Sequence, residues 1–300
     1  MEKAVMEVLK YFNFFAYAPS SDEIYTFLSV KTTKKELRQK LTSMVKHGFL
    51  LRQYLSLPAI FNFAFLTFNL PLYTLPPHRI FFDERVDRAH ISRKKIEGAI
   101  PFIQLLARIT SLQMIGLSGG VAMMNAGRGD DIDFFIITSA GRLWTTRMSV
   151  LAGAEMCGVR RKRKSRRVKD SLCFNLFFEE TDLTVPKEKQ NLYVAHEIVQ
   201  MKPFVIKDNS YSRFLMANQW VRRFFPNCKS FDYAQDLQYT NTSKKYKRNT
   251  NYIGDAVEFL CKKIQLFIMS RHRSTERITD TQLWFFPRDF ERKLRRRHIV

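Results

Sequence analysis

The stretch that decides the fold reads Leu117-Ser118-Gly119-Gly120 and, after a short polar connection, Asp130-Asp131-Ile132-Asp133-Phe134-Phe135-Ile136-Ile137-Thr138. An apolar segment leads into the glycine turn, and a β-type run follows the acidic residues. Asp131 and Asp133 are two positions apart, so in a strand both side chains project from one face. Two carboxylates on one rigid face suit Mg²⁺, which prefers hard oxygen ligands and keeps open positions for phosphates. Glycines upstream let backbone N–H groups approach a polyphosphate.

The same residues carry a resemblance to a known family. Ser118-Gly119-Gly120, then Asn125, then Asp131-Ile132-Asp133 resembles the signature of the polymerase-beta-type nucleotidyltransferase superfamily. That signature is a Gly-Gly or Gly-Ser turn followed about ten residues later by an Asp-x-Asp strand. Residues 141–147 and 191–197 are similar to a bacterial subgroup of stand-alone members. An Asp-x-Asp pair alone is more often solvent-facing, so the glycine turn is what makes the pattern specific.

The resemblance is clearest over residues 100–205 and implies an α+β fold, a small mixed β-sheet backed by helices. It implies that Asp131 and Asp133 bind Mg²⁺, with Mn²⁺ as the alternative ion. It also implies that Ser118, Gly119 and Gly120 cradle the triphosphate of a nucleoside triphosphate. The implied enzyme transfers a nucleoside monophosphate to a hydroxyl group of a protein, a small molecule or an RNA end. The acceptor and the preferred base stay open.

The chain departs from the family pattern at one position. The superfamily supplies a third carboxylate from a later strand, and here the expected strand, residues 171–178, has Asn175 where that acid belongs. An amide cannot act as a base and is a weaker metal ligand. Asp170 and Glu179, at the two ends of this strand, are the candidates to replace it.

Four further side chains are weaker candidates for nucleotide contacts. Arg142 and Arg147 follow the aspartate strand on an expected helix, and either a phosphate contact or a surface position fits them. His196 and Glu197 lie in a helical stretch, 192–201, where packing or surface roles compete with a role in the site.

The order of apolar and polar segments predicts several units. Residues 1–50 read as three short helices followed by an extended segment, which is the winged-helix pattern. Ser20 and Glu23 have capping-box spacing at the second helix, and Thr33 begins the third. The expected organisation is a winged-helix-like domain over 1–77, a linker or helix over 78–98, the nucleotidyltransferase core over 99–205, and a helical C-terminal region over 206–300 with a flexible spacer at 227–251. In that last region, 251–270 and 279–297 read as helices, and Trp284 as a structural residue.

Basic residues point to polyanionic partners. The net charge is +22, which favours nucleotides, nucleic acids and acidic surfaces without choosing among them. Residues 31–40 are basic enough for a DNA-binding helix, although such a module also mediates protein contacts. The run at 159–169 is either a phosphate or RNA clamp or a solvated, mobile connector. The rival functional hypothesis is therefore a winged-helix nucleic-acid-binding protein with a degenerate, non-catalytic transferase domain.

The location expected from the sequence is the cytoplasm. The four cysteines have neither metal-ligand nor disulfide-framework spacing, and the N-terminus lacks a secretory signal pattern. Residues 53–77 carry no charge, but four prolines interrupt them, so buried strands or a hairpin are expected. The sequence therefore argues against a membrane partner, with anchoring through 53–77 as the alternative.

Overall fold

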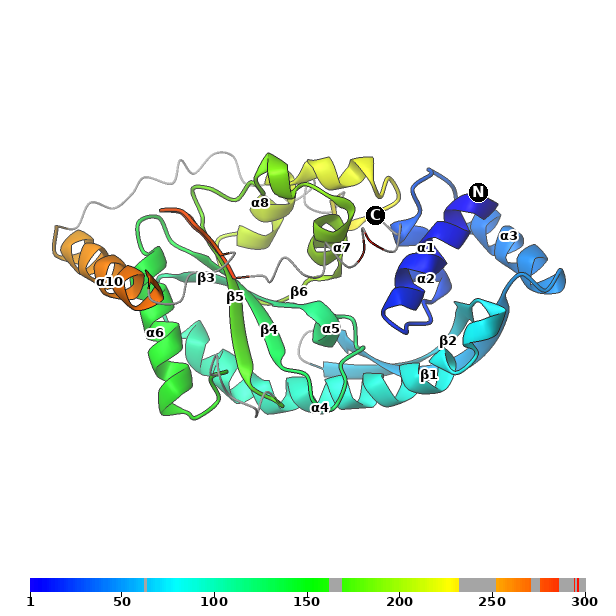
Figure 1. The fold of residues 1–300 in the computed structure, drawn as a ribbon, viewed down its shortest axis with the longest axis horizontal. Helices are drawn as coiled ribbons and strands as arrows, with labels where there is room; N and C mark the ends of the chain where they lie inside the picture. The colour runs from blue at the N-terminus through cyan, green and yellow to red at the C-terminus, as the bar shows by residue number, and fades with distance from the viewer. Residues whose placement is uncertain are drawn as a thin grey trace.

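A computed structural model describes residues 1–61, 64–161, 169–231, 252–270 and 276–285, together with Leu294 and Arg296. The fold is mixed α and β, with a six-stranded mixed sheet and a separate hairpin (Figure 1). The helices are α1 (Glu2–Phe14), α2 (Ser21–Phe27), α3 (Lys34–Lys46), α4 (Phe81–Ala107), α5 (Gly119–Ala122), α6 (Leu143–Met156), α7 (Leu192–Gln200), α8 (Ser210–Ala217) and α10 (Tyr252–Ser270), with 3-10 turns at Pro76–His78, Lys187–Lys189 and Gln219–Arg223. The strands are β1 (Leu51–Phe61), β2 (Ala64–Thr74), β3 (Leu112–Ser118), β4 (Ile132–Thr138), β5 (Leu172–Glu179), β6 (Lys202–Ile206), β7 (Arg277–Ile278) and β8 (Gln282–Trp284).

The N-terminal region contains the expected three helices followed by a hairpin. Capping boxes begin both α2 and α3: Ser20 with Glu23 in the first, Thr33 with Glu36 in the second. Strands β1 and β2 pair antiparallel along their whole length, which confirms a hairpin within 53–77. Of the helices in the described ranges, none has both the length and the apolar character needed to cross a membrane.

Helix α4 joins the N-terminal region to the central sheet. It packs against the hairpin and against β3, and it runs beneath both (Figure 1). The residues expected to form a linker at 78–98 are mostly the first part of this one helix, which continues through Pro101. Its buried residues recur at helical spacing throughout, so the same face packs inward in both halves. This face is mostly apolar but includes Arg85, Ser92 and Lys95.

The central sheet has the order β6-β3-β4-β5-β8-β7. Strand β4 pairs antiparallel with β3 and parallel with β5, so it lies in the interior of the sheet. Its side chains alternate between two cores. Ile132, Phe134 and Ile136 face the core built with α4 and α6, whereas Phe135 and Ile137 face the core built with α1, α7 and α8. By the same alternation, Asp131 and Asp133 lie on the side of Phe135 and Ile137.

The C-terminal region differs from the sequence-based expectation. Residues 277–278 and 282–284 form β7 and β8, so the expected helix over 279–297 is wrong for its first part. Strand β8 pairs antiparallel with β5, where Leu283 and Trp284 are buried. The helix expected over 251–270 is confirmed as α10. The greater part of the expected spacer, residues 232–251, lies outside the described residues.

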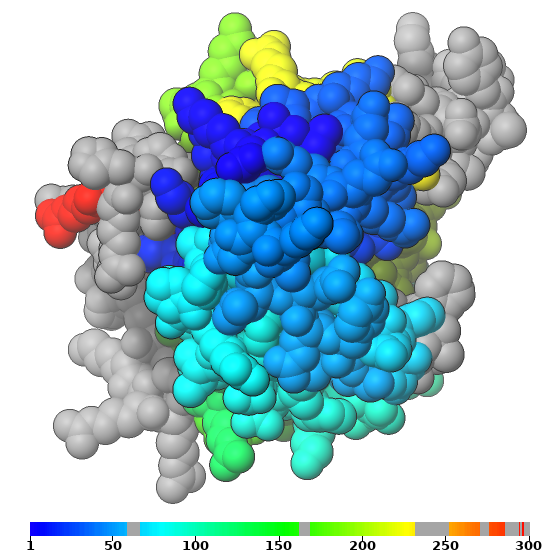
Figure 2. Space-filling model, turned by 90° about the vertical axis from the view of Figure 1, so that its right-hand side faces the viewer, coloured from blue at the N-terminus to red at the C-terminus, as the bar shows by residue number. Residues whose placement is uncertain are grey.

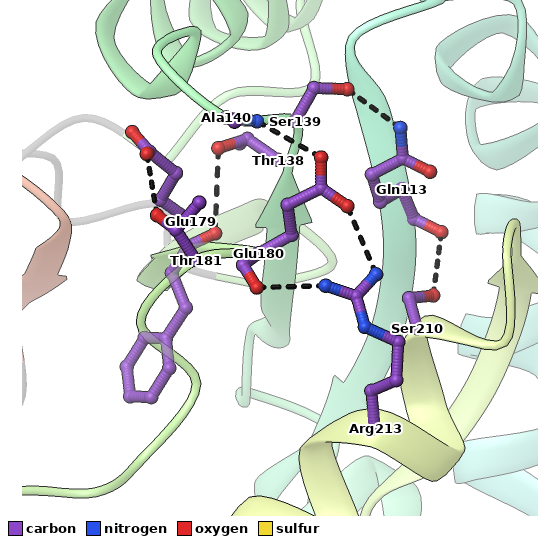
Figure 3. A network of polar contacts seen from close by, with 10 residues as sticks. Gln113, Thr138, Ser139, Ala140, Glu179, Glu180, Thr181, Ser210 and Arg213 are labelled. Carbon is purple, nitrogen blue, oxygen red and sulfur yellow. Dashed lines mark hydrogen bonds and ion pairs between the residues drawn. The ribbon is translucent and has the colours of Figure 1, made fainter. Parts of the chain in front are cut away.

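A polar network fixes the end of the sheet where β4 and β5 finish (Figure 3). Glu180 is buried, and its carboxylate accepts hydrogen bonds from the Ala140 N–H at 3.1 Å and from Arg213 at 3.0 Å. Arg213 also donates to the Glu180 carbonyl at 2.8 Å. Because both charges are paired and bonded, the β5 end, the loop after β4 and α8 are held together.

Figure 2 shows the end of the molecule formed by the N-terminal helices, the hairpin and the beginning of α4, which together make one continuous face. Helix α10 lies at the opposite end, against α6 (Figure 1). The core that contains α1, α7 and α8 therefore lies between the N-terminal region and the sheet.

Candidate active site

The glycine corner at the end of β3 lies directly beside the aspartate strand. Ser118 is paired with Asp133 in the β3–β4 ladder, and Gly119 follows with a φ of 64°. A Cβ atom at position 119 would come within 3.0 Å of the Oδ2 atom of Asp133. Glycine is thus required here both by the left-handed backbone and by the close approach of the carboxylate.

The two aspartates converge. A possible ligand atom from each of Asp131, Asp133 and Cys173 lies within 4.8 Å of the others. This follows from strand geometry, because Asp131 and Asp133 share a face of β4 and Cys173 is the ladder partner of Asp133 on β5. The structure therefore places both sequence-predicted carboxylates together, next to Gly119.

Asn175 reaches the same point through an irregularity in β5. The register shifts between Phe134 and Phe135 of β4, which leaves Asn175 as the extra residue on β5. Its side-chain amide donates a hydrogen bond to Asp133, and its carbonyl oxygen accepts one from the Cys173 thiol at 2.8 Å. Asn175 therefore holds the position where a third acid was expected.

The two acids suggested as replacements are elsewhere. Asp170 forms an ion pair with the buried Lys95 at 2.6 Å, and Lys95 also bonds the Asp130 carbonyl. Glu179 accepts a hydrogen bond from Thr181 at 2.7 Å. Neither carboxylate lines the cavity that contains Asp131 and Asp133. Both suggestions are therefore wrong: Asp170 belongs to the packing of α4, and Glu179 to the far end of the strand.

Glu197 of α7 is the third acid of this site. Burial raises the pKa of its carboxylate to about 7, although the nearby Gly119 N–H and Tyr193 side chain act to lower it. Burial also raises the pKa of Asp133 to about 7, with further contributions from the charges of Asp131 and Glu197. Sequence reasoning ranked Glu197 low, because a lone acid in an apolar helix has no pattern that marks it.

The effect of the Glu197 charge on the pKa of Asp133 can be measured directly. In the Glu197→Gln variant the pKa of Asp133 is expected to fall from about 7, because one nearby negative charge is removed. Carbon-13 NMR titration of the aspartate carboxyl groups, without added metal, measures this value. A Glu179→Gln variant serves as the control and should leave the titration unchanged. An unchanged pKa in Glu197→Gln would show that the helix acid lies too far away to act on Asp133.

Arg161 brings a positive charge to the site. Its guanidinium group donates to the Asp131 carboxylate and lies 3.7 Å from the Cys173 sulfur. Arg161 belongs to the basic run at 159–169, of which residues 162–168 lie outside the described ranges. The part of the run that the structure describes thus reaches the aspartates.

A cavity of about 480 Å³ opens above these residues, between α1 and the sheet. One wall is polar and the other is aromatic, with side chains from the N-terminal region. The lining residues are Tyr11, Phe12, Phe15, Tyr17, Arg88, Ser118, Gly119, Gly120, Val121, Met123, Asn125, Asp130, Asp131, Asp133, Arg161, Asn175, Tyr193, Glu197 and Gln200. All five sequence-predicted site residues are in this set. The N-terminal helices are therefore a structural part of the site and not a separate appendage.

His196 has a packing role. Its ring stacks on Tyr11 at 3.6 Å between centroids and on Phe27 at 4.5 Å, and it is fully enclosed by the core. Burial lowers the pKa of His196 well below its usual range, so the ring is neutral. The imidazole does not line the cavity.

This burial predicts a pH dependence of stability. Unfolded His196 binds a proton below about pH 6.5, but the folded protein cannot accept it, so stability is lost as the pH falls through that value. Between pH 7.5 and pH 5.5 the loss is about 1 kcal/mol. The raised pKa values of Asp133 and Glu197 increase stability as the pH falls, which opposes the effect of His196. The effect of His196 is therefore measured as a difference between two proteins. The free energy of unfolding of His196→Phe, measured with urea at both pH values, should fall by about 1 kcal/mol less than that of the original chain. Equal falls would contradict the account.

Arg142 and Arg147 are not in the site. Arg142 pairs with Asp255 of α10 at 2.8 Å. Arg147 donates to Gln265 of α10 at 2.5 Å, and burial lowers its pKa to about 10. Neither lines the cavity, so the suggested phosphate contacts are corrected to contacts that hold α10 against α6.

The donor set fits a hard divalent cation. Two carboxylates lie on one face, Gly119 places no side chain between the corner and Asp133, and the Arg161 guanidinium pairs with Asp131. Burial raises the pKa of the Cys173 thiol, and sulfur is a soft donor that suits a hard cation less well than carboxylate oxygens do. The oxygens of Asp131 and Asp133 are therefore the candidate ligands.

Comparisons of this chain with protein-family models, with curated proteins and with solved structures found no match.

Proposed function

We propose that this protein is a metal-dependent nucleotidyltransferase that moves a nucleoside monophosphate from a nucleoside triphosphate to a hydroxyl group. The observation that carries the proposal is the meeting of Asp131 and Asp133 with the Gly119 corner in one cavity. The order β3–α5–β4–α6–β5, in which β4 pairs antiparallel with β3 and parallel with β5, also supports the proposal.

Different residues of the site would hold the metal ion and the phosphates. Asp131 and Asp133 would hold Mg²⁺ or Mn²⁺, which would supply positive charge to neutralise the charge that develops on the phosphates. Ser118, Gly119 and Gly120 face the cavity where the triphosphate would lie. Arg161, once released from Asp131, can pair with phosphate oxygens. The cavity of about 480 Å³ has a volume suited to one nucleotide.

Glu197 is the candidate proton acceptor in place of Asn175. Its carboxylate lies in the cavity, and its pKa of about 7 suits proton exchange with a hydroxyl group near neutral pH. The same carboxylate lies near the Gly119 N–H, at the corner that would receive the triphosphate. The acid thus comes from a helix that packs over the sheet, and not from β5.

The test uses the position of a radioactive label. The full chain is incubated with a cell extract, Mg²⁺ and each of ATP, GTP, CTP and UTP, labelled at the α-phosphate or at the γ-phosphate. Transfer of α-label to an acceptor, with γ-label released as pyrophosphate, is the expected result for one or more of the four. Transfer of γ-label would indicate a phosphotransferase and overturn the proposal. No transfer with any nucleotide would also count against it.

A second candidate function rests on α3. Lys31, Lys35 and Arg38 are exposed, as a nucleic-acid contact requires. Lys34 and Lys40 are instead ion-paired, with Asp22 at 2.5 Å and with Glu2 at 2.7 Å. Salt-sensitive binding of duplex DNA that is lost when Lys31, Lys35 and Arg38 are replaced by alanine, without any nucleotidyl transfer, would favour this function.

A further inference from the structure

Helix α10 buries polar side chains of its own against the rest of the protein. The buried residues of this helix are Glu258, Cys261 and Gln265, one turn apart. A helix on the surface of a protein ordinarily turns its apolar stripe to the core and its polar side to solvent. Here the inward side carries a buried carboxylate and a buried amide beside Cys261, Leu266 and Met269, and other large apolar residues lie on the outward side.

The inward side is held by specific polar contacts with α6. Glu258 accepts hydrogen bonds from the Trp144 and Thr145 N–H groups at 2.7 and 2.8 Å, which caps the first turn of α6. Gln265 donates to the Trp144 carbonyl at 2.7 Å and accepts from Arg147 at 2.5 Å. These partners fix the rotation of α10 about its own axis. They therefore also determine which of its residues face outward.

The outward face is a continuous apolar stripe. Val257, Leu260, Ile264 and Ile268 follow one another at helical spacing and are 43%, 58%, 43% and 59% exposed. Phe259, which is 61% exposed, flanks the stripe, and the ammonium group of Lys263 lies 5.3 Å from the centre of its ring. Exposed apolar side chains that are scattered singly are ordinary, but a continuous row of them marks a binding surface.

We propose that the outward face of α10 docks on an anionic lipid surface. Charge complementarity selects this occupant, because the chain carries a net charge of +22 and the exposed Lys263 borders the stripe. A helix with one apolar face and basic neighbours lies in the plane of a bilayer interface and buries that face among the acyl chains. A second copy of the chain would bring two net charges of +22 together, which disfavours a homodimer through this face.

This contact is peripheral and differs from a membrane span. Helix α10 has 19 residues and is about 28 Å long, and its polar contacts with α6 remain intact when it lies flat. The sequence alone does not reveal this surface, because hydrophobic periodicity shows that a helix has an apolar face but does not show which face packs inward.

Co-flotation with vesicles tests the proposal. The full chain is mixed with phosphatidylcholine vesicles that contain 30% phosphatidylglycerol or none, the composition being about that of a moderately anionic membrane. Binding to the anionic vesicles is expected, and it should weaken as salt is raised. The Leu260→Gln/Ile264→Gln variant should bind at least about tenfold more weakly, because two apolar side chains no longer enter the bilayer.

The matched control is Met156→Gln, an apolar side chain that is 88% exposed but lies outside α10; it should bind like the original chain. Sedimentation velocity on the same proteins tests for a second copy. Absence of vesicle binding, equal binding by the Leu260→Gln/Ile264→Gln variant, or a dimer that this variant abolishes would each overturn the proposal. Circular dichroism spectra are recorded for both variants. Since all three replaced side chains are exposed, loss of binding with an unchanged spectrum supports the lipid contact.

Discussion

Replacing Asp131 and Asp133 together by asparagine is expected to lower nucleotidyl transfer by more than about a thousandfold. Both carboxylates face one point beside Gly119, and their substitution removes the negative charge that would hold a divalent cation there. The initial rate of α-label transfer, measured with saturating nucleotide and Mg²⁺, gives the effect directly. The fold should survive, because asparagine has nearly the same shape and Asp133 is already hydrogen-bonded to an amide.

The control for this variant is Glu179→Gln on the neighbouring strand. Glu179 is an acid at the end of β5, bonded to Thr181 and outside the cavity, so its substitution should leave the rate within about twofold. A double variant that retained most of the activity would show that the two aspartates have another role, whatever the nature of the reaction.

The second large effect is expected for Gly119→Ala. Position 119 has a φ of 64°, which costs a non-glycine residue about 1–2 kcal/mol, and the new methyl group would lie 3.0 Å from the Asp133 carboxylate. The Asp133 carboxylate must then move by a few tenths of an ångström. Because misplacement of catalytic groups is costly, transfer should fall about a hundredfold.

Gly129→Ala is the matched control. It lies in the same connection between β3 and β4, where a Cβ atom would meet no other atom within 4 Å and the backbone is not left-handed. Its activity and its free energy of unfolding should stay close to those of the original chain. If Gly119→Ala behaved like Gly129→Ala, the close approach of the corner to Asp133 would have no functional importance.

Some features of this protein can be read from its sequence because they depend on local patterns. Capping boxes mark the starts of α2 and α3, and both are present. The spacing of Asp131 and Asp133 fixes their common face once β4 forms. The glycine corner is equally local, since a left-handed residue beside a strand end needs glycine.

Other features depend on contacts between distant segments. Glu197 joins the site only because α7 packs over the sheet, and no spacing in the sequence links it to Asp133. Strands β7 and β8 have two and three residues, which is too short for an alternating pattern to show. The rotation of α10 depends on polar partners in α6 that lie more than one hundred positions away.

The central claim is that Asp131 and Asp133 jointly hold a divalent cation together with a nucleotide. Electron paramagnetic resonance of Mn²⁺, with a non-hydrolysable nucleoside triphosphate, measures this binding without any knowledge of the acceptor. The account predicts that the signal of free Mn²⁺ falls when the original chain is added, and that it does not fall with Asp131→Asn/Asp133→Asn. Equal loss of free Mn²⁺ with both proteins, or no loss with either, would contradict it.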